Sequence, residues 1–316
     1  MKAFILAAGL GTRLRPLTST YAKPALPLGH KPMLRRVIED LVRAGISDIR
    51  VNSHHLPETV DAVLADCHNL DANLTSQFEA ELLGTGGALL ASADWIGESP
   101  LLIVNGDAVA DVSFESLIAE HRSNAPLATM ALRVPDKGEQ FGPVEIDRSG
   151  KVVRILEDGP TQPNTHVRMF CGIHILESKF LELLKPEGFS CVVRRGYLEA
   201  LRRGCMVQSY LHTGYFADAG TPGRFLDAHW YTLLSEHPAG AGHGPAQTRG
   251  STWWLEEGIE FGADVELGDR VSIGKGARVG EGAYLEDTLI ERGAIVNQGE
   301  RLVGVIRLAS GATAIR

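Results

Sequence analysis

The sequence predicts an α/β protein with a mostly parallel sheet, followed by a short parallel β-helix. Short apolar runs alternate with amphipathic stretches over residues 1–134, as in repeated strand–helix–strand units. Residues 237–252 are rich in Gly, Ala and Pro, a composition typical of linkers. Beyond them, glycines and aliphatic residues recur every six positions. We therefore expect domains at 1–236 and 253–316, joined by a linker at 237–252.

The first half of the chain supplies the parallel units. Residues 2–8 read as a strand, and 32–44 as a helix whose apolar residues share one face before Gly45 ends it. Strands are expected next at 48–53, 74–78 and 101–104, with helices at 57–67 and 87–95. Such an order predicts right-handed crossovers.

Residues 127–228 show a weaker pattern. Alternating segments at 144–146, 152–156 and 172–176 indicate strands without intervening helices. We expect them to extend the same sheet in an antiparallel or mixed manner.

The six-residue period after the linker predicts inward-facing aliphatic residues on each face of a β-helix. The glycines in step are Gly262, Gly268, Gly274 and Gly280, and the aliphatic residues are Val265, Val271, Ala277, Ala283, Leu289 and Ile295. Trp253 and Trp254 directly follow the linker and are interpreted as an anchor of the β-helix on the main domain or on a partner.

Composition narrows the function. The net charge of −8 argues against binding to nucleic acid or to an anionic membrane, because both are approached through Lys and Arg. The 4 cysteines have no CxxC spacing, which argues against a zinc site or a disulfide framework and favours a cytoplasmic location. The apolar N-terminal stretch is too short for a signal peptide or a membrane span.

A glycine-containing loop, Gly9-Leu10-Gly11, follows the first strand and can bring backbone N–H groups close to phosphate oxygens. It is no dinucleotide fingerprint, because Leu14 occupies the third glycine position, and no Gly-Lys-Ser/Thr of a Walker A loop follows. Arg13, Arg15 and Lys23 come shortly after, in an otherwise acidic chain. Triphosphate chemistry needs such cations.

This stretch, continued by Lys23-Pro24-Ala25-Leu26-Pro27-Leu28 and Lys31-Pro32-Met33, closely resembles the sugar-phosphate nucleotidylyltransferase family. Further similar segments are Glu81-Leu82-Leu83-Gly84-Thr85-Gly86-Gly87, Asn105-Gly106-Asp107, Phe141-Gly142-Pro143-Val144 and Tyr215-Phe216-Ala217-Asp218-Ala219-Gly220. The resemblance implies a Rossmann-like sheet of the nucleotide-diphospho-sugar transferase type over 1–236 and a left-handed β-helix at 253–316. It also implies an enzyme that joins a nucleoside triphosphate (NTP) to a sugar 1-phosphate and releases pyrophosphate.

The same resemblance suggests a role for each matching residue. Arg13 and Lys23 would be catalytic, Asp107 and Asp218 would bind Mg²⁺, and Gly142, Glu157 and Gly172 would contact the sugar. Nucleotide contacts are expected from Leu6, Ala8, Gly9, Gly11, Thr12, Glu81, Gly84, Thr85, Gly86 and Asn105.

The residues fit that chemistry. Mg²⁺ typically takes one or two carboxylates plus substrate phosphates. Asp107 ends an apolar strand, where α/β sheets usually bind ligands, and Asp218 is flanked by small residues. The sugar phosphate is already an ionised nucleophile, so Arg13 mainly has to neutralise the departing pyrophosphate.

Two departures from the family pattern leave the substrate open. Glu157-Asp158 stands where many relatives have Glu-Lys, and an acid there would repel the incoming phosphate. Either Arg154 or Arg168 supplies the missing charge, or the loop at 158–167 is arranged differently. Glu81 and the Gly84-Thr85-Gly86-Gly87 loop resemble guanylyl- and some uridylyl-transferring members more than thymidylyl-transferring ones, and the β-helix resembles that of mannose-1-phosphate guanylyltransferases. Phe170-Cys171-Gly172 instead resembles uridylyltransferases acting on N-acetylmuramic acid 1-phosphate.

Two other classes compete. A catalytically silent regulatory subunit would share the fold, but the retained Arg13, Lys23, Asp107 and Asp218 argue against it. An acetyl-transferring β-helix would need a general base, and residues 259–306 contain no histidine. The β-helix is therefore predicted to mediate homo-oligomer assembly.

Overall fold

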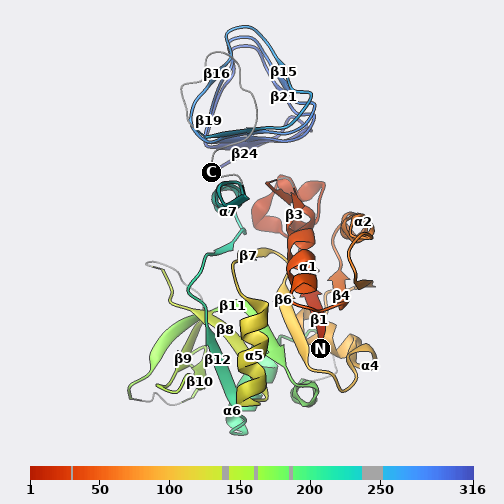
Figure 1. The fold of residues 1–316 in the computed structure, drawn as a ribbon, viewed down its shortest axis with the longest axis vertical. Coiled ribbons are helices and arrows are strands. Elements are labelled where there is room, and N and C mark those ends of the chain that lie inside the picture. Colours follow the sequence, from red (N-terminus) through yellow and green to blue (C-terminus); the bar gives the residue numbers. More distant parts are fainter. Residues whose placement is uncertain (30, 137–141, 160–162, 185–187, 237–251) are drawn as a thin grey trace. The chain divides into compact units, whose positions relative to one another are not determined.

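The computed structural model of the protein describes residues 1–29, 31–136, 142–159, 163–184, 188–236 and 252–316 (Figure 1). The chain divides into two compact units. Unit 1 comprises Met1–Leu10 and Met33–Phe216, and unit 2 comprises Gly11–Pro32 and Ala217–Arg316. The predicted linker lies outside the described residues except for Thr252, and the predicted boundary at residue 236 stays a prediction.

The centre of unit 1 is a parallel sheet. Strand β1 (Lys2–Leu6) lies between β4 (Asp48–Ser53) and β6 (Leu101–Asn105), and β5 (Asn73–Phe78) extends the sheet beyond β4. Each of these pairs is parallel. The intervening helices are α1 (Met33–Arg43), α2 (Pro57–Asp66), α3 (Gly84–Ala91) and α4 (Ala93–Ile96). The predicted strand–helix order is confirmed.

Beyond β6 the sheet becomes antiparallel, as expected for a mixed extension. The long strand β11 (His166–Leu176) runs antiparallel to β6, to β8 (Ala128–Arg133) and to β9 (Pro143–Ile146). The outer strands are β10 (Val152–Ile155) and β12 (Val207–Leu211). Every residue of β8 is buried, so this strand has no polar alternation and the sequence pattern missed it.

Helices cover this half of the sheet and connect its strands. Helix α5 (Phe114–Asn124) packs on β8 and β12 and begins with Ser113, whose hydroxyl accepts the N–H of Ser116 as an N-cap. The remaining elements of unit 1 are β7 (Ala108–Ala110), a 3₁₀ helix (Ser178–Leu183), a π-helix (Val192–Tyr197) and α6 (Leu198–Arg202).

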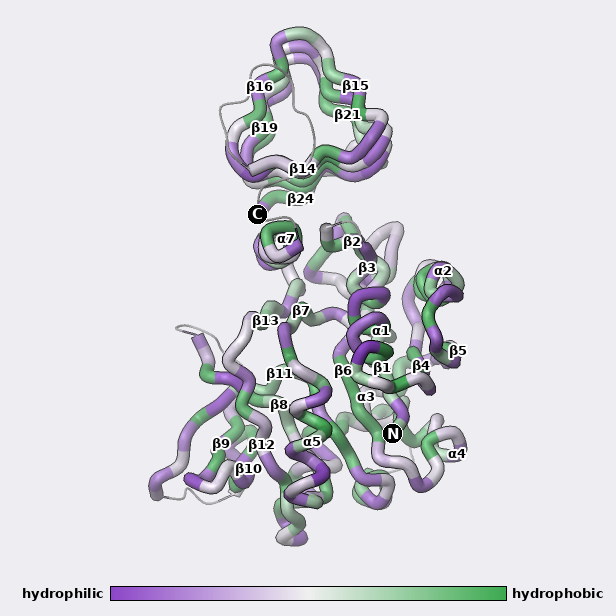
Figure 2. Tube along the Cα trace, viewed as in Figure 1, coloured by the Kyte–Doolittle hydropathy of each residue, from purple (hydrophilic) through white to green (hydrophobic). Residues whose placement is uncertain are grey.

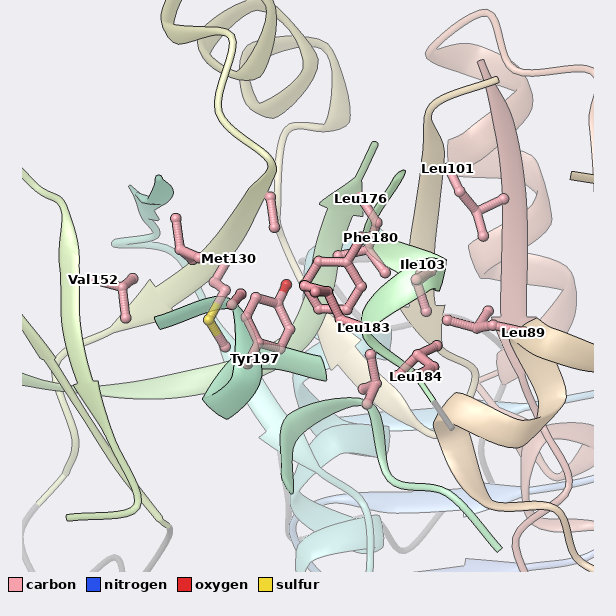
Figure 3. Packing of buried hydrophobic residues seen from close by; sticks show 14 of the residues in the cluster. Leu89, Leu101, Ile103, Met130, Val152, Leu176, Phe180, Leu183, Leu184 and Tyr197 are labelled. Atoms are coloured by element: carbon pink, nitrogen blue, oxygen red, sulfur yellow. The ribbon is translucent and has the colours of Figure 1, made fainter. Parts of the chain in front are cut away.

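The hydrophobic core of unit 1 joins the parallel and antiparallel parts of the sheet (Figure 3). Phe180 and Tyr197 meet edge to face, with ring centroids 5.0 Å apart, beside Met130 and Leu184. Ile103 of β6 belongs to the same cluster. The carboxyl ends of the central strands are therefore held on a packed, rigid base.

Unit 2 contains a β-helix. In the described residues its parallel strands form three faces, seen as a triangle when viewed along the coils (Figure 1). The first face consists of β14 (Trp253–Leu255), β17 (Val271–Ile273), β20 (Thr288–Ile290) and β23 (Val305–Arg307). The second consists of β15 (Glu260–Phe261), β18 (Arg278–Val279) and β21 (Ile295–Val296). The third consists of β16 (Glu266–Leu267), β19 (Tyr284–Glu286) and β22 (Arg301–Val303). β24 (Thr313–Ile315) closes the first face by antiparallel pairing. The predicted β-helix is confirmed.

The predicted register is wrong in the later coils. Val271 pairs with Trp253, eighteen residues earlier, but with Thr288, only seventeen residues later. The shortening shifts the alternation by one position, so Ile290 is buried inside and Leu289 is not, and Ile295 is 53% exposed. Figure 2 shows hydrophobic and hydrophilic residues alternating around these coils. The strict six-residue period therefore ends after Ala283.

The predicted tryptophan anchor is confirmed for Trp254. This residue is fully buried and stacks on Trp230 of helix α7 (Pro222–Glu236), with ring centroids 5.7 Å apart. Unit 2 also includes the β2 (Pro27–Leu28) and β3 (Lys31–Pro32) hairpin, whose Gly29 N–H donates to His229 Nδ1 of α7 at 3.1 Å. In the part of the chain that the structure describes, no helix has the length and hydropathy needed to cross a bilayer.

Candidate functional site

The carboxyl ends of β1 and β6 lie side by side. Leu6 pairs with Asn105, and the N–H of Gly106 donates to Leu6 O at 2.9 Å. A Cβ on Gly106 would come within 2.8 Å of Ile5 Cγ2, so the close approach requires glycine. The chain places β4 on one side of β1 and β6 on the other, and such a reversal of strand order is where open α/β sheets bind ligands.

Several predicted residues lie at this edge of unit 1. Ala8 is buried and Gly9 is exposed just after β1, while Asp107 is partly buried just after β6. The structure thus gathers the predicted nucleotide contacts Leu6, Ala8 and Asn105 on neighbouring strand ends.

In unit 2 the residues after Leu10 form three short 3₁₀ turns: Thr12–Leu14, Leu17–Ser19 and Lys23–Ala25. Gly11 has a φ of 61° and its carbonyl accepts the Thr18 hydroxyl at 2.9 Å. A Cβ there would lie 2.8 Å from Thr18 Cγ2, so only glycine fits both the backbone and the space. This turn exposes Arg13, whose side chain is 67% accessible.

Asp218 of β13 (Phe216–Asp218) collects three cations, all within unit 2. Lys23 Nζ lies 3.0 Å from Oδ1, and Arg13 Nη2 and Arg224 Nη1 lie 3.6 and 3.9 Å from Oδ2. Lys23 is buried, at 5% exposure, and a buried ammonium needs such a partner. We call these four residues the Asp218 cluster. The structure brings together Arg13, Lys23 and Asp218 as predicted, and adds Arg224, which the sequence analysis missed.

Gly220 makes room for this cluster. A Cβ at this position would lie 2.9 Å from Arg13 Nη2 and 3.0 Å from both oxygens of Asp218. The small residues around Asp218 in the sequence therefore reflect a real steric requirement.

Gly172 plays a similar part in unit 1. Its φ is 71°, and a Cβ there would come within 2.3 Å of Asn105 Nδ2. The pairing of β11 with β8 shifts register between Phe170 and His174, around this glycine. Gly172 thus leaves the space that the Asn105 side chain occupies, which brings a predicted sugar residue and a predicted nucleotide residue into contact.

The Gly84-Thr85-Gly86 segment starts helix α3. The N–H of Gly86 donates to Ser190 O at 2.8 Å, and the Thr85 hydroxyl accepts the N–H of Val192 at 2.9 Å. Gly84 has a φ of 72°, and a Cβ there would lie 2.6 Å from Ser190 O. These groups hold the loop against residues 190–192. Glu81, also predicted to contact the nucleotide, is exposed beside them.

The predicted sugar segment carries an ion pair where a repulsive acid was expected. Asp158 Oδ2 lies 2.8 Å from Arg202 Nη2, so its charge is balanced. Arg154 is held by Glu145 at 2.7 Å and by the carbonyls of Glu157 and Gly159. Arg154 is therefore poorly available to replace the missing lysine.

The other sugar-site predictions are placed only in part. Glu157 and Gly142 are exposed, and Phe141 lies outside the described residues. Arg168 donates a hydrogen bond from Nη1 to the carbonyl of Val167, which is a weaker interaction than the ion pair of Arg154 with Glu145. Arg168 is thus the better placed of the two candidate cations.

Two buried polar residues were missed by the sequence analysis. Asn52 lies in β4 and Glu79 follows β5, and each is 3% exposed. Asparagine is depleted in strands, so its position in the predicted strand 48–53 was a usable signal. Glu79 was overlooked beside the exposed Glu81.

A cavity of about 370 Å³ lies in unit 2. Its wall includes Leu17, Leu26, Phe225, Ile290 and Arg292, and none of the predicted site residues lines it. This cavity is therefore not lined by the residues of the Asp218 cluster.

Comparisons with known proteins show to which family the chain belongs. The Nucleotidyl transferase family profile matches residues 2–233. A mannose-1-phosphate guanyltransferase of Schizosaccharomyces pombe is 30% identical over 230 residues, covering 72% of this chain and 62% of the relative. The chain thus spans less than two thirds of that relative's length.

Two further matches cover more of the partner sequence. A mannose-1-phosphate guanylyltransferase of Mycobacterium tuberculosis is 29% identical over 309 residues, which is 96% of this chain and 79% of the relative. The structure of a putative glucose-1-phosphate thymidylyltransferase from Bacillus anthracis, solved with a sucrose, matches with a TM-score of 0.62 and 26% identity, over 78% of this chain and 98% of that one. The chain belongs to the nucleotidyl transferase family.

Proposed function

We propose that this protein transfers a nucleotidyl group from an NTP to a sugar 1-phosphate, with GTP and mannose 1-phosphate as the favoured pair. The Asp218 cluster is the observation that carries the proposal. In a chain of net charge −8, it concentrates two exposed guanidinium groups and a buried ammonium around one carboxylate. Such a surplus of positive charge suits a polyphosphate.

The chemistry asks little of the protein beyond positioning. An ionised phosphate oxygen of the sugar 1-phosphate attacks the α-phosphorus, forming a new P–O bond while the bond to the bridging oxygen breaks and pyrophosphate leaves. No general base is needed, because the nucleophile is already charged. Arg13, whose side chain is 67% exposed, neutralises the departing group, and Lys23 adds a second positive charge.

Asp107 and Asp218 are the proposed ligands of Mg²⁺. When bound, this ion would act as a Lewis acid and template for the substrate phosphates. The donor set supports an ion that arrives with the nucleotide: the described residues contain no group of three or more His, Cys, Asp or Glu able to form an all-protein site. Two carboxylates plus phosphate oxygens is the usual arrangement for Mg²⁺.

The substrate pair is favoured by the relatives. The proteins of S. pombe and M. tuberculosis are both named for mannose 1-phosphate and a guanylyl group. The alternative is UTP with N-acetylmuramic acid 1-phosphate or another hexose 1-phosphate. Two sequence features support this alternative. One is the Phe170-Cys171-Gly172 segment, and the other is Asp158, which stands where many relatives have a lysine.

The test is pyrophosphate release in the presence of Mg²⁺, with each of the four ribonucleoside triphosphates crossed with a panel of sugar 1-phosphates. We expect the highest kcat/KM for GTP with mannose 1-phosphate. A preference for UTP would select the alternative. Absence of release in every combination would refute the enzyme assignment in favour of a regulatory subunit.

A further inference from the structure

Strand β4 and the loops that follow β1 and β5 are joined by one chain of hydrogen bonds at the carboxyl ends of the parallel strands. The N–H of Ala7, after β1, donates to Asn52 Oδ1 at 2.7 Å. Asn52 Nδ2 donates to Glu79 Oε1 at 2.7 Å, and Glu79 Oε2 accepts the N–H of Leu83 at 3.0 Å. We call this chain the Asn52–Glu79 relay, and all of its members belong to unit 1.

The relay has a fixed polarity. Both ends are backbone N–H groups, which can only donate. Asn52 accepts one hydrogen bond from Ala7 and donates one to Glu79, and Leu83 also donates to Glu79. Glu79 must therefore accept at both of its carboxylate oxygens. A carboxylate satisfies this arrangement, whereas an amide at position 79 would bring one donor too many into a site that is 3% exposed.

Glu79 is also held through its backbone. Its N–H donates to Ser53 O at 2.8 Å, and its carbonyl lies 2.8 Å from His54 Nδ1. The residue is thus fastened to the end of β4 on both sides. Because its backbone is held at the end of β4, its carboxylate fixes the position of Leu83, which directly precedes Gly84.

From this geometry we infer that Asn52 and Glu79 are positioning residues for the nucleotide. The relay sets the spacing between the start of the Ala8-Gly9 loop and the start of the Gly84-Thr85-Gly86 segment, the two places in unit 1 assigned to nucleotide contacts. This inference rests on the proposed function. Neither residue touches the reacting atoms, so their loss should weaken NTP binding more than turnover.

The experiment uses three variants of the full-length protein. Glu79→Gln and Asn52→Asp each break the donor–acceptor order. The double variant Asn52→Asp with Glu79→Gln restores it: the new carboxylate accepts from Ala7 and from the new amide, whose oxygen accepts from Leu83. Glu58→Gln, which removes an exposed acid from α2, is the matched control.

We expect each single variant to raise KM for the NTP by about 10-fold, the scale of one buried donor left without an acceptor. KM for the sugar 1-phosphate should change less than about 3-fold, and the double variant should regain most of the NTP affinity. Calorimetric titration with NTP and Mg²⁺ gives the same comparison without turnover.

Three results would overturn the inference: unchanged NTP affinity in Glu79→Gln, a double variant no better than the single ones, or equal losses for both substrates. If the single variants fail to fold, the double variant decides alone, because the inference requires it to fold and bind NTP. Turnover and NTP binding by the unmodified protein test the proposed function separately. If this protein binds NTP but turns over no substrate, the enzyme assignment fails, and the effect of the relay on NTP binding can still be measured. If it binds no NTP, both fail.

Discussion

Asp218 and Asp287, both in unit 2, each gather several cationic or polar partners but in different ways. The carboxylate of Asp287 accepts a hydrogen bond from Trp230 Nε1 at 2.9 Å, and it forms ion pairs with Arg270 Nη2 at 3.0 Å and Arg316 Nη1 at 2.7 Å. Around Asp218 only Lys23 is at hydrogen-bond distance, while the arginines stand at 3.6 and 3.9 Å. One carboxylate is closely enclosed by its partners, and the other is loosely surrounded.

The difference separates the structural ion pairs of Asp287 from the proposed binding cluster around Asp218. The partners of Asp287 tie α7, the β-helix and the C-terminal Arg316 together, and their hydrogen bonds are short. Arg13 makes no such short bond to Asp218, and its side chain is 67% exposed, so its charge is still available to a ligand. Distance and exposure, rather than the number of charges, distinguish the two carboxylates.

The strongest test of this contrast is Arg13→Ala. We expect turnover to fall at least ~100-fold, the effect of losing one preorganised charge-stabilising group. The melting temperature should stay unchanged, because the side chain is mostly exposed. Steady-state kinetics and thermal unfolding measure the two effects. Arg43→Ala, a similarly exposed arginine on α1, is the control, and equal turnover in both variants would remove Arg13 from the mechanism.

Asp287→Ala should show the opposite behaviour. The substitution leaves the Trp230 N–H and two arginines without their shared acceptor, and we expect a loss of about 2–3 kcal/mol in the free energy of unfolding. Turnover per folded molecule should be retained. Urea unfolding followed by tryptophan fluorescence measures the loss, and Asp287→Asn, which keeps an oxygen acceptor, should lose less.

A third prediction concerns the pH dependence of stability and a buried histidine of unit 1, His174. Burial lowers the pKa of His174 to about 3, and its Nδ1 lies 2.8 Å from the Tyr197 hydroxyl. Unfolded histidine has a pKa near ~6.5, so between these values the unfolded chain binds more protons. Stability should therefore fall as the pH drops from about 6.5 toward 3, by up to roughly 1.4 kcal/mol per pH unit from this group.

The measurement is urea unfolding at pH 7 and pH 5 for the unmodified protein and His174→Phe. The phenylalanine would pack between Phe170 and Tyr197, which already contact the imidazole ring. Carboxylates such as Asp218 and Asp287 are common to both proteins, so the difference in slope reports His174. Identical slopes would show that this residue does not set the acid sensitivity.

The smallest effect is expected for Arg292→Ala. Arg292 makes a two-pronged ion pair with Glu256, with distances of 2.8 and 2.6 Å, but its side chain is 63% exposed. Solvent screening should limit the loss in unfolding free energy to about 1 kcal/mol or less. A loss as large as that of Asp287→Ala would mean that exposure does not separate the two kinds of pair.

Local patterns predicted much of the fold. The strands and helices from Lys2 to Asn105 follow from apolar periodicity, because each element buries one face within a few residues of chain. Motif resemblance also selected Arg13, Lys23 and Asp218. Strand β8 was missed because it is buried on both faces, and the β-helix register failed at a coil that is one residue shorter.

By itself the sequence determined the strand–helix order, the β-helix and the choice of charged residues proposed to bind phosphate, since these depend on neighbours along the chain. Only the tertiary structure decided that Asp158 pairs with Arg202, that Gly172 clears space for Asn105, and that Asn52 and Glu79 join β4 to the loops after β1 and β5. Those contacts link residues up to 67 positions apart. Short-range periodicity carries no information about such pairs, because they form only when the sheet brings distant strand ends together.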